Sequence, residues 1–180
     1  MRITGIVSGY ACLALSLLIV AEILGRKLFN FSIQGVDEIG GYVVAITGTF
    51  GMAVAAWHRA HTRLDIVQSR LPMLGRAITN VFAYLTLAIG AAFMAYMAWQ
   101  TLSETIEFKS VSSTPLQTPL WIPQTFWFLG LMLFTVTAAT MALHGLVLLK
   151  NDVAKADQSL QPTTLREELE TIDQQVEHKS

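Results

Sequence analysis

The sequence predicts an all-α integral membrane protein with four transmembrane helices, and two observations carry this prediction. First, 53% of the 180 residues are hydrophobic and only 14% are charged, whereas a soluble domain averages about 25% charged residues. Because a soluble surface needs charge, this shortage indicates a chain surrounded by lipid. Second, four apolar segments are each long enough to cross a bilayer, which takes about 20 residues. Their apolar character is continuous, unlike the alternation of barrel strands.

The expected spans are Ile3 to Gly25, Ile39 to Trp57, Ile78 to Leu102 and Ile122 to Leu149. Arg2 followed by an apolar run is a pattern shared with secretory signal peptides, but this run exceeds their usual 7–15 residues. No A-x-A cleavage site precedes Glu22, so we expect an uncleaved helix. Before the fourth span, Pro119 and Pro123 mark an extended lead-in, and Pro123 suits the first helical turn.

The composition changes after Lys150, which divides the chain into a four-helix membrane domain at residues 1–150 and a polar tail at residues 151–180. Within the tail, apolar residues recur at spacings of four, three and four, and Thr164 and Glu167 have the spacing of a capping box. These apolar residues are Leu165, Leu169, Ile172 and Val176. We therefore expect a short amphipathic helix in the cytoplasm.

The distribution of Lys and Arg predicts the orientation, because cytoplasmic loops carry an excess of both. With the N-terminus inside, seven cations lie on the cytoplasmic side and three on the other side. The first group is Arg2, Arg59, Arg63, Arg70, Arg76, Lys150 and Lys155, and the second is Arg26, Lys27 and Lys109. We therefore expect a multi-pass membrane protein with both termini cytoplasmic.

The cytoplasmic loop HRAHTRLDIVQSRLP, residues 58–72, has a helical pattern of its own. Leu64, Val67 and Leu71 recur at three and four residues beside several arginines, which suits the level of the lipid headgroups. We expect a short interfacial helix here, broken by Pro72 and Gly75 before the third span.

Acidic residues near the spans are candidates for a functional or structural role. Glu22 lies about one turn from the outer end of the first span, and Arg26, four residues later, is spaced to pair with it on one helix face. Asp37 and Glu38 open the second span, where negative charge complements the helix dipole. An ion pair at the interface accounts for Glu22 and Arg26 at least as well as an ion-binding role does. For Asp37 and Glu38 the local role at the helix start is sufficient and is the favoured interpretation.

The histidines raise a different possibility. His61 and His144 both lie at cytoplasmic helix ends, and two such residues could ligate a b-type haem in the membrane anchor of a respiratory enzyme. The plainer interpretation is that the histidines bind no metal, and we expect no cofactor. The sequence contains no nucleophile, base and orienter in a plausible arrangement and no Gly-rich phosphate loop. We therefore expect no enzymatic activity. The net charge of −1 also gives no reason to expect a nucleic acid partner.

Several short features, taken in order and spacing, are typical of one family. They are Arg26 after the first span, Asp37-Glu38 opening the second, Gly51 within it, HTRLD with His61 and Asp65, Leu71-Pro72, and SSTPLQTPLWIP before the fourth span. With them, residues 1–150 resemble the small membrane subunit of tripartite ATP-independent periplasmic (TRAP) transporters. Two features depart from the family: Gln34-Gly35 stands where a Trp often precedes the acidic pair, and the tail has no counterpart.

The resemblance implies a subunit that braces a large permease subunit, which carries the substrate and sodium sites. A soluble periplasmic binding protein would deliver an organic acid, and transport would be coupled to an ion gradient without ATP hydrolysis. No direct substrate site is then expected in this chain, and membrane lipid is its other partner. On this reading His61 and Asp65 form a structural pair that fixes the cytoplasmic loop. A haem-carrying anchor and an unrelated four-helix membrane protein remain the alternatives.

Overall fold

The computed structural model describes residues 2–58 and 71–151 of the 180-residue chain. The described part contains four long helices, α1 (Arg2–Phe29), α2 (Val36–Trp57), α4 (Met73–Glu107) and α5 (Trp121–Asn151). All four are long and apolar enough to cross a membrane. The prediction of an all-α membrane protein with four spans is therefore confirmed.

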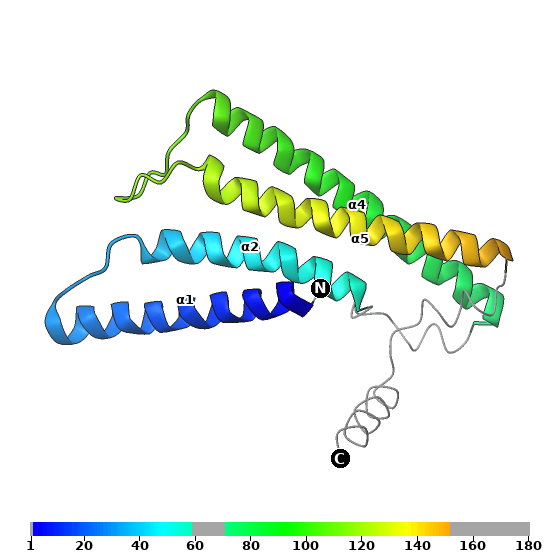
Figure 1. The fold of residues 1–180 in the computed structure, drawn as a ribbon, viewed down its shortest axis with the longest axis horizontal. Coiled ribbons are helices and arrows are strands. Elements are labelled where there is room, and N and C mark those ends of the chain that lie inside the picture. Colours follow the sequence, from blue (N-terminus) through cyan, green and yellow to red (C-terminus); the bar gives the residue numbers. More distant parts are fainter. Residues whose placement is uncertain (1, 59–70, 152–180) are drawn as a thin grey trace, which may run out of the picture.

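The helices lie side by side in the order α1, α2, α5, α4, so the last of the described helices, α5, lies between α2 and α4 (Figure 1). The contacts follow this order, because α1 packs on α2, α2 on α5 and α5 on α4. Burial follows the position in the row. In the most apolar stretch of each helix, 33% of the residues are buried in α5 but only 6% in the edge helix α1. The helices form an open row whose faces remain available.

Small side chains bring the central helices together. Ala53 and Ala56 of α2 form one buried cluster with Ala91 of α4 and Phe134 of α5. The helices α2 and α5 approach closely at Gly130 of α5, where an added Cβ would lie 2.2 Å from Oγ1 of Thr49 on α2. Backbones without bulky side chains can approach closely, which favours packing in membranes where lipid is as apolar as the protein. Gly130 therefore sets the spacing between α2 and α5.

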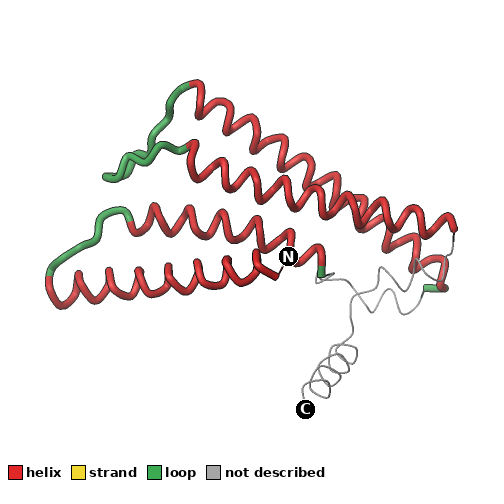
Figure 2. Tube along the Cα trace, viewed as in Figure 1, coloured by secondary structure: helices red, strands yellow, loops and turns green. Residues whose placement is uncertain are grey.

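The α1–α2 and α4–α5 connections are loops at the same end of the row, which we call the loop-bearing end (Figure 2). After α1 the chain reverses at Asn30, whose φ is +50°, and the N–H of Phe31 donates to the carbonyl of Gly25 at 3.1 Å. Between α4 and α5, Val111 and Pro119 form an antiparallel bridge. The lead-in to α5 is thus non-helical and partly extended, as expected, and it also folds back on itself. Pro123 does lie in the first turn of α5, as its missing N–H allows.

The helices extend beyond the predicted spans. At 1.5 Å per residue, the 35 residues of α4 measure about 52 Å, while the hydrocarbon core is about 30 Å thick. Its ends therefore reach the headgroup level or the helix is tilted. The third span begins earlier than expected, because α4 starts at Met73 and Gly75 lies within its first turn. Pro72 alone therefore precedes this span, and Gly75 belongs to it. The expected interfacial helix and the tail helix fall outside the described residues.

Candidate functional site

Glu22 fixes the way in which the chain leaves α1. The residue is 5% exposed, and its carboxylate accepts hydrogen bonds from the hydroxyl of Ser32 at 2.9 Å and from the backbone N–H of Ile33. The residue is also 3.1 Å from Nε of Arg26, with which it forms an ion pair. One carboxylate thus binds the last turns of α1 to the segment that leads into α2.

Arg26 has a different environment from its partner, because 67% of its side chain is exposed. The pairing that the four-residue spacing allows is present, but the network around Glu22 reaches beyond the helix face to Ser32 and Ile33. A carboxylate withdrawn from water needs several donors, and the returning loop supplies two of them. A local structural role therefore accounts for the geometry of Glu22 and Arg26, and the α1–α2 connection takes part in it through Ser32 and Ile33.

Glu38 and Asp37 are neighbours in the first turn of α2 but differ in exposure to solvent. Asp37 is exposed, as suits a charge that complements the helix dipole. Glu38 is only 7% exposed, and its Oε1 accepts a hydrogen bond from the hydroxyl of Tyr42 at 2.7 Å. The dipole argument alone therefore accounts for Asp37, while Glu38 has a tertiary role.

That role is to hold the connection between α4 and α5 against α2. Ser112 and Thr118 approach the Glu38 carboxylate from this connection, although Oε2 has no well-formed hydrogen bond among the described residues. Leu116 packs over the N-terminus of α2, since an added Cβ on Gly35 would lie 2.1 Å from its Cδ1. The α4–α5 connection is thus seated on the start of α2.

Gly35 makes this contact possible for two reasons. Its φ of +86° belongs to the left-handed region, which side chains with a Cβ rarely adopt, and it lies directly against Leu116. The residue therefore joins the α1–α2 connection to the α4–α5 connection. The two acidic residues and this glycine together order the loop-bearing end of the protein.

The structure adds less about the histidines and about Asp65, which the sequence also suggested as candidates. His61 and Asp65 lie outside the described residues, so their proposed pairing stays a prediction. His144 is exposed on α5, and His58 follows the end of α2. Within residues 2–58 and 71–151, no group of three or more His, Cys, Asp and Glu side chains converges on a metal site.

Sequence reasoning missed several polar residues, among them the half-buried Tyr42 and the buried Asn80 and Tyr84. Tyr42 is the partner of Glu38, and its i+4 position could have identified it. Asn80 and Tyr84 on α4 are 0% and 2% exposed. Tyr84 belongs to a cluster with Val81 and Ala142 of α5. A polar pair at i and i+4 within an otherwise apolar helix was the available indication.

Comparison with known proteins adds one match. The family model described as "Tripartite ATP-independent periplasmic transporters, DctQ component" matches residues 15–148, which is more than half of the chain. This range begins within α1 and ends within α5, so it includes the acidic residues at the loop-bearing end. None of the curated proteins compared with the chain matches it significantly.

Proposed function

This chain belongs to the DctQ family, the small membrane component of TRAP transporters, and we propose that it braces the large permease subunit of such a transporter. The family consists of transporter components and is not enzymatic. The large permease subunit and a periplasmic binding protein are the partners that this family implies. The bacterial inner membrane is the corresponding location.

The observation that carries the bracing role is the open row of helices. The edge helix α1 contacts α2, but only 6% of its most apolar window is buried. Gly5 and Gly9 on α1 have no atom within 4 Å of an added Cβ. Because small residues allow backbones to approach closely in a membrane, this face suits packing against helices of a larger protein.

The ordered loop end supports the same role. Glu22 and Glu38 are withdrawn from water and used for internal contacts, which makes the connections rigid without committing them to a substrate. A scaffold that offers its partner a fixed surface loses less conformational entropy on binding. The substrate, which we propose is an organic acid delivered by the binding protein, would be handled by the other components. Coupling to a sodium gradient would also belong to the large subunit.

The orientation and the domain division complete the proposal. We place both termini in the cytoplasm, on the seven-to-three distribution of Lys and Arg. The loop-bearing end with Glu22 and Glu38 then faces the periplasm. Residues 1–150 form the membrane domain and residues 151–180 a cytoplasmic tail with a short helix. His61 and Asp65 fix the cytoplasmic loop.

Transport in proteoliposomes tests the function directly. The small chain alone should not move substrate, whereas the small and large subunits together with the binding protein should. Omission of the small chain should reduce both the uptake rate and the yield of folded large subunit. Substrate uptake by the small chain alone would refute the bracing role, as would full uptake without it.

The partner face can be tested with matched glycine substitutions. Gly9→Leu on α1 and Gly90→Leu on α4 both enter open space within this chain, so neither should unfold it. Gly9→Leu should weaken co-purification with the large subunit, and Gly90→Leu should not. The reverse ranking would move the proposed interface from the α1 edge of the row to the α4 edge.

A further inference from the structure

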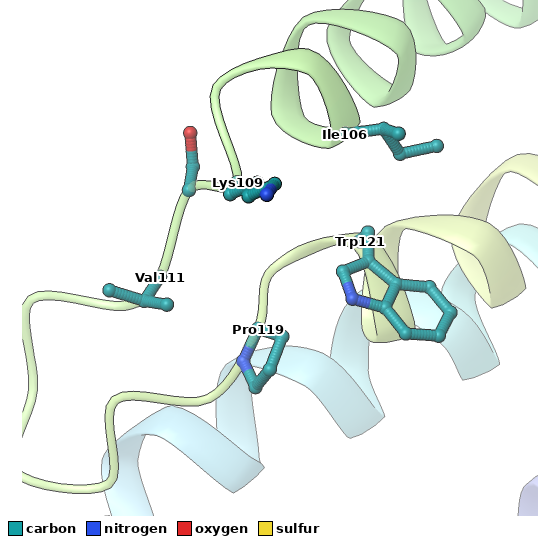
Figure 3. A pocket seen from close by; sticks show the side chains of 6 residues that line it. Ile106, Lys109, Val111, Pro119 and Trp121 are labelled. Carbon is teal, nitrogen blue, oxygen red and sulfur yellow. The ribbon is translucent and has the colours of Figure 1, made fainter.

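A cavity of about 480 Å³ lies between the end of α4 and the start of α5. Its lining consists of Ile106, Lys109, Ser110, Val111, Pro119 and Trp121. Lys109 extends toward the space between Ile106 and Trp121 (Figure 3). The volume falls within the range of roughly 300–1,000 Å³ that is usual for small-molecule sites. Four apolar side chains and one cationic amine therefore share one hollow.

The backbone around Lys109 is held in place by the end of α4. The N–H of Ser110 donates to the carbonyl of Thr105 at 3.1 Å, and the N–H of Lys109 donates to that of Ile106 at 3.3 Å. This is a Schellman motif with Lys109 at the left-handed position, where φ is +48°. Glycine is the usual residue there, because a Cβ makes this conformation unfavourable. The sequence nevertheless places a long cationic side chain at this position.

The opposite wall is also fixed. The N–H of Leu120 donates to the carbonyl of Ser110 at 3.1 Å, and Val111 pairs with Pro119 in the antiparallel bridge. Trp121 is the first residue of α5. The two sides of the cavity are thus joined by backbone hydrogen bonds, so its shape is set by the fold.

The depth of the cavity in the membrane indicates its ligand. Ile106 and Trp121 lie at the ends of two membrane-spanning helices, and tryptophan favours the level of the lipid headgroups. The described residues offer Lys109 no salt bridge. An amine above apolar walls at this level is complementary to a phosphate attached to acyl chains. We propose that this cavity binds an acidic phospholipid, with Lys109 contacting the phosphate and Ile106 and Trp121 contacting the first part of a chain.

Native mass spectrometry of the full-length chain in a non-ionic detergent tests this site. Dioleoyl phosphatidylglycerol should bind in preference to phosphatidylcholine with the same chains. Lys109→Gln should weaken phosphatidylglycerol binding about fivefold, corresponding to about 1 kcal/mol for one cation near a membrane surface. Lys109→Arg should retain binding, because it keeps the charge.

Lys27→Gln is the matched control, since Lys27 is an exposed cation in the last turn of α1 at the same end of the protein. It should leave binding within about twofold of the wild type, whereas a general surface attraction would weaken both variants equally. Equal losses in Lys27→Gln and Lys109→Gln, or equal binding of the two lipids, would overturn the proposal.

Two further measurements distinguish a bound lipid from a free phosphate and from a protein contact. Glycerol 3-phosphate carries the phosphate without chains, so it should compete only at much higher concentration if the apolar walls contribute. Competition at the same concentration as the lipid would indicate an anion site instead. If Lys109→Gln weakens docking of the soluble binding protein but leaves lipid binding unchanged, the cavity is a protein contact and the lipid proposal is wrong.

Discussion

Gly130→Ala should destabilise the protein by forcing α2 and α5 apart. The new Cβ would lie 2.2 Å from Oγ1 and 2.8 Å from Cβ of Thr49, so one of the two helices must move by about 1 Å to restore ordinary contacts of 3.5–4.0 Å. Thr49 cannot easily turn away. It is 5% exposed, and its hydroxyl donates to the carbonyl of Ile46 at 2.9 Å.

The expected magnitude follows from the cost of overpacking, which is about 1–3 kcal/mol. Two effects set the range. Alanine has the higher helix propensity, by about 1 kcal/mol, which offsets part of the clash, while the contact lies in the middle of the row and leaves no room for relaxation. A loss of about 2 kcal/mol would lower the melting temperature by about 4–8 °C for a chain of this length.

The assay is thermal unfolding of the purified chain in detergent, followed by circular dichroism. Gly48→Ala and Gly51→Ala on α2 are the controls, because an added Cβ at either position meets nothing within 4 Å. Both should melt at the wild-type temperature or up to about 4 °C above it, because alanine has the higher helix propensity and meets no clash. Thr49→Gly combined with Gly130→Ala should recover part of the loss, since the small residue is then on the other helix.

The reasoning is refuted if Gly130→Ala melts at the wild-type temperature, because the close approach of α2 and α5 would then not exist. It is also refuted if the control glycines are equally sensitive. In that case the loss would come from a general effect of alanine and not from Thr49.

Three other predictions follow from the loop-bearing end and the orientation. Glu22→Gln should lower the melting temperature more than Arg26→Gln, because Gln offers one acceptor where the carboxylate offers two; equal losses would mean that the ion pair alone matters. Gly35→Ala should speed proteolytic cleavage of the α4–α5 connection, since a Cβ meets Leu116 at a left-handed φ; an unchanged cleavage rate would contradict the seating of this connection on α2. Reporter fusions after Leu71 and after Lys150 should both give cytoplasmic signals, and a periplasmic signal at either would reverse the orientation.

The number of spans and their positions could be predicted from the sequence because both are local properties. An apolar run of about 20 residues can satisfy its backbone hydrogen bonds in lipid only as a helix or within a barrel, and the continuous runs select the helix. The pairing of Glu22 with Arg26 was equally predictable, because a spacing of four places both on one face of a helix.

The lateral order α1, α2, α5, α4 was not predictable in this way. In a soluble protein, the apolar stripe of a helix identifies its buried face. Here apolar residues surround every helix, since one side meets lipid and the other meets protein. The small-residue pattern was also a poor guide. Gly5 and Gly9 meet open space, while the close contact lies at Gly130.

The candidate site depends both on local sequence properties and on tertiary contacts. Glu22 and Glu38 could be selected from the sequence because charge is rare at membrane depth. Their partners could not, because Ser32, Ile33 and the α4–α5 connection reach them only after the chain has turned back. The cavity beside Lys109 depends on the same kind of proximity between the end of α4 and the start of α5. Charge and hydropathy thus determined which segments enter the membrane, and only side-chain shape at close contacts decided which helices and loops meet, because lipid provides no apolar preference between them.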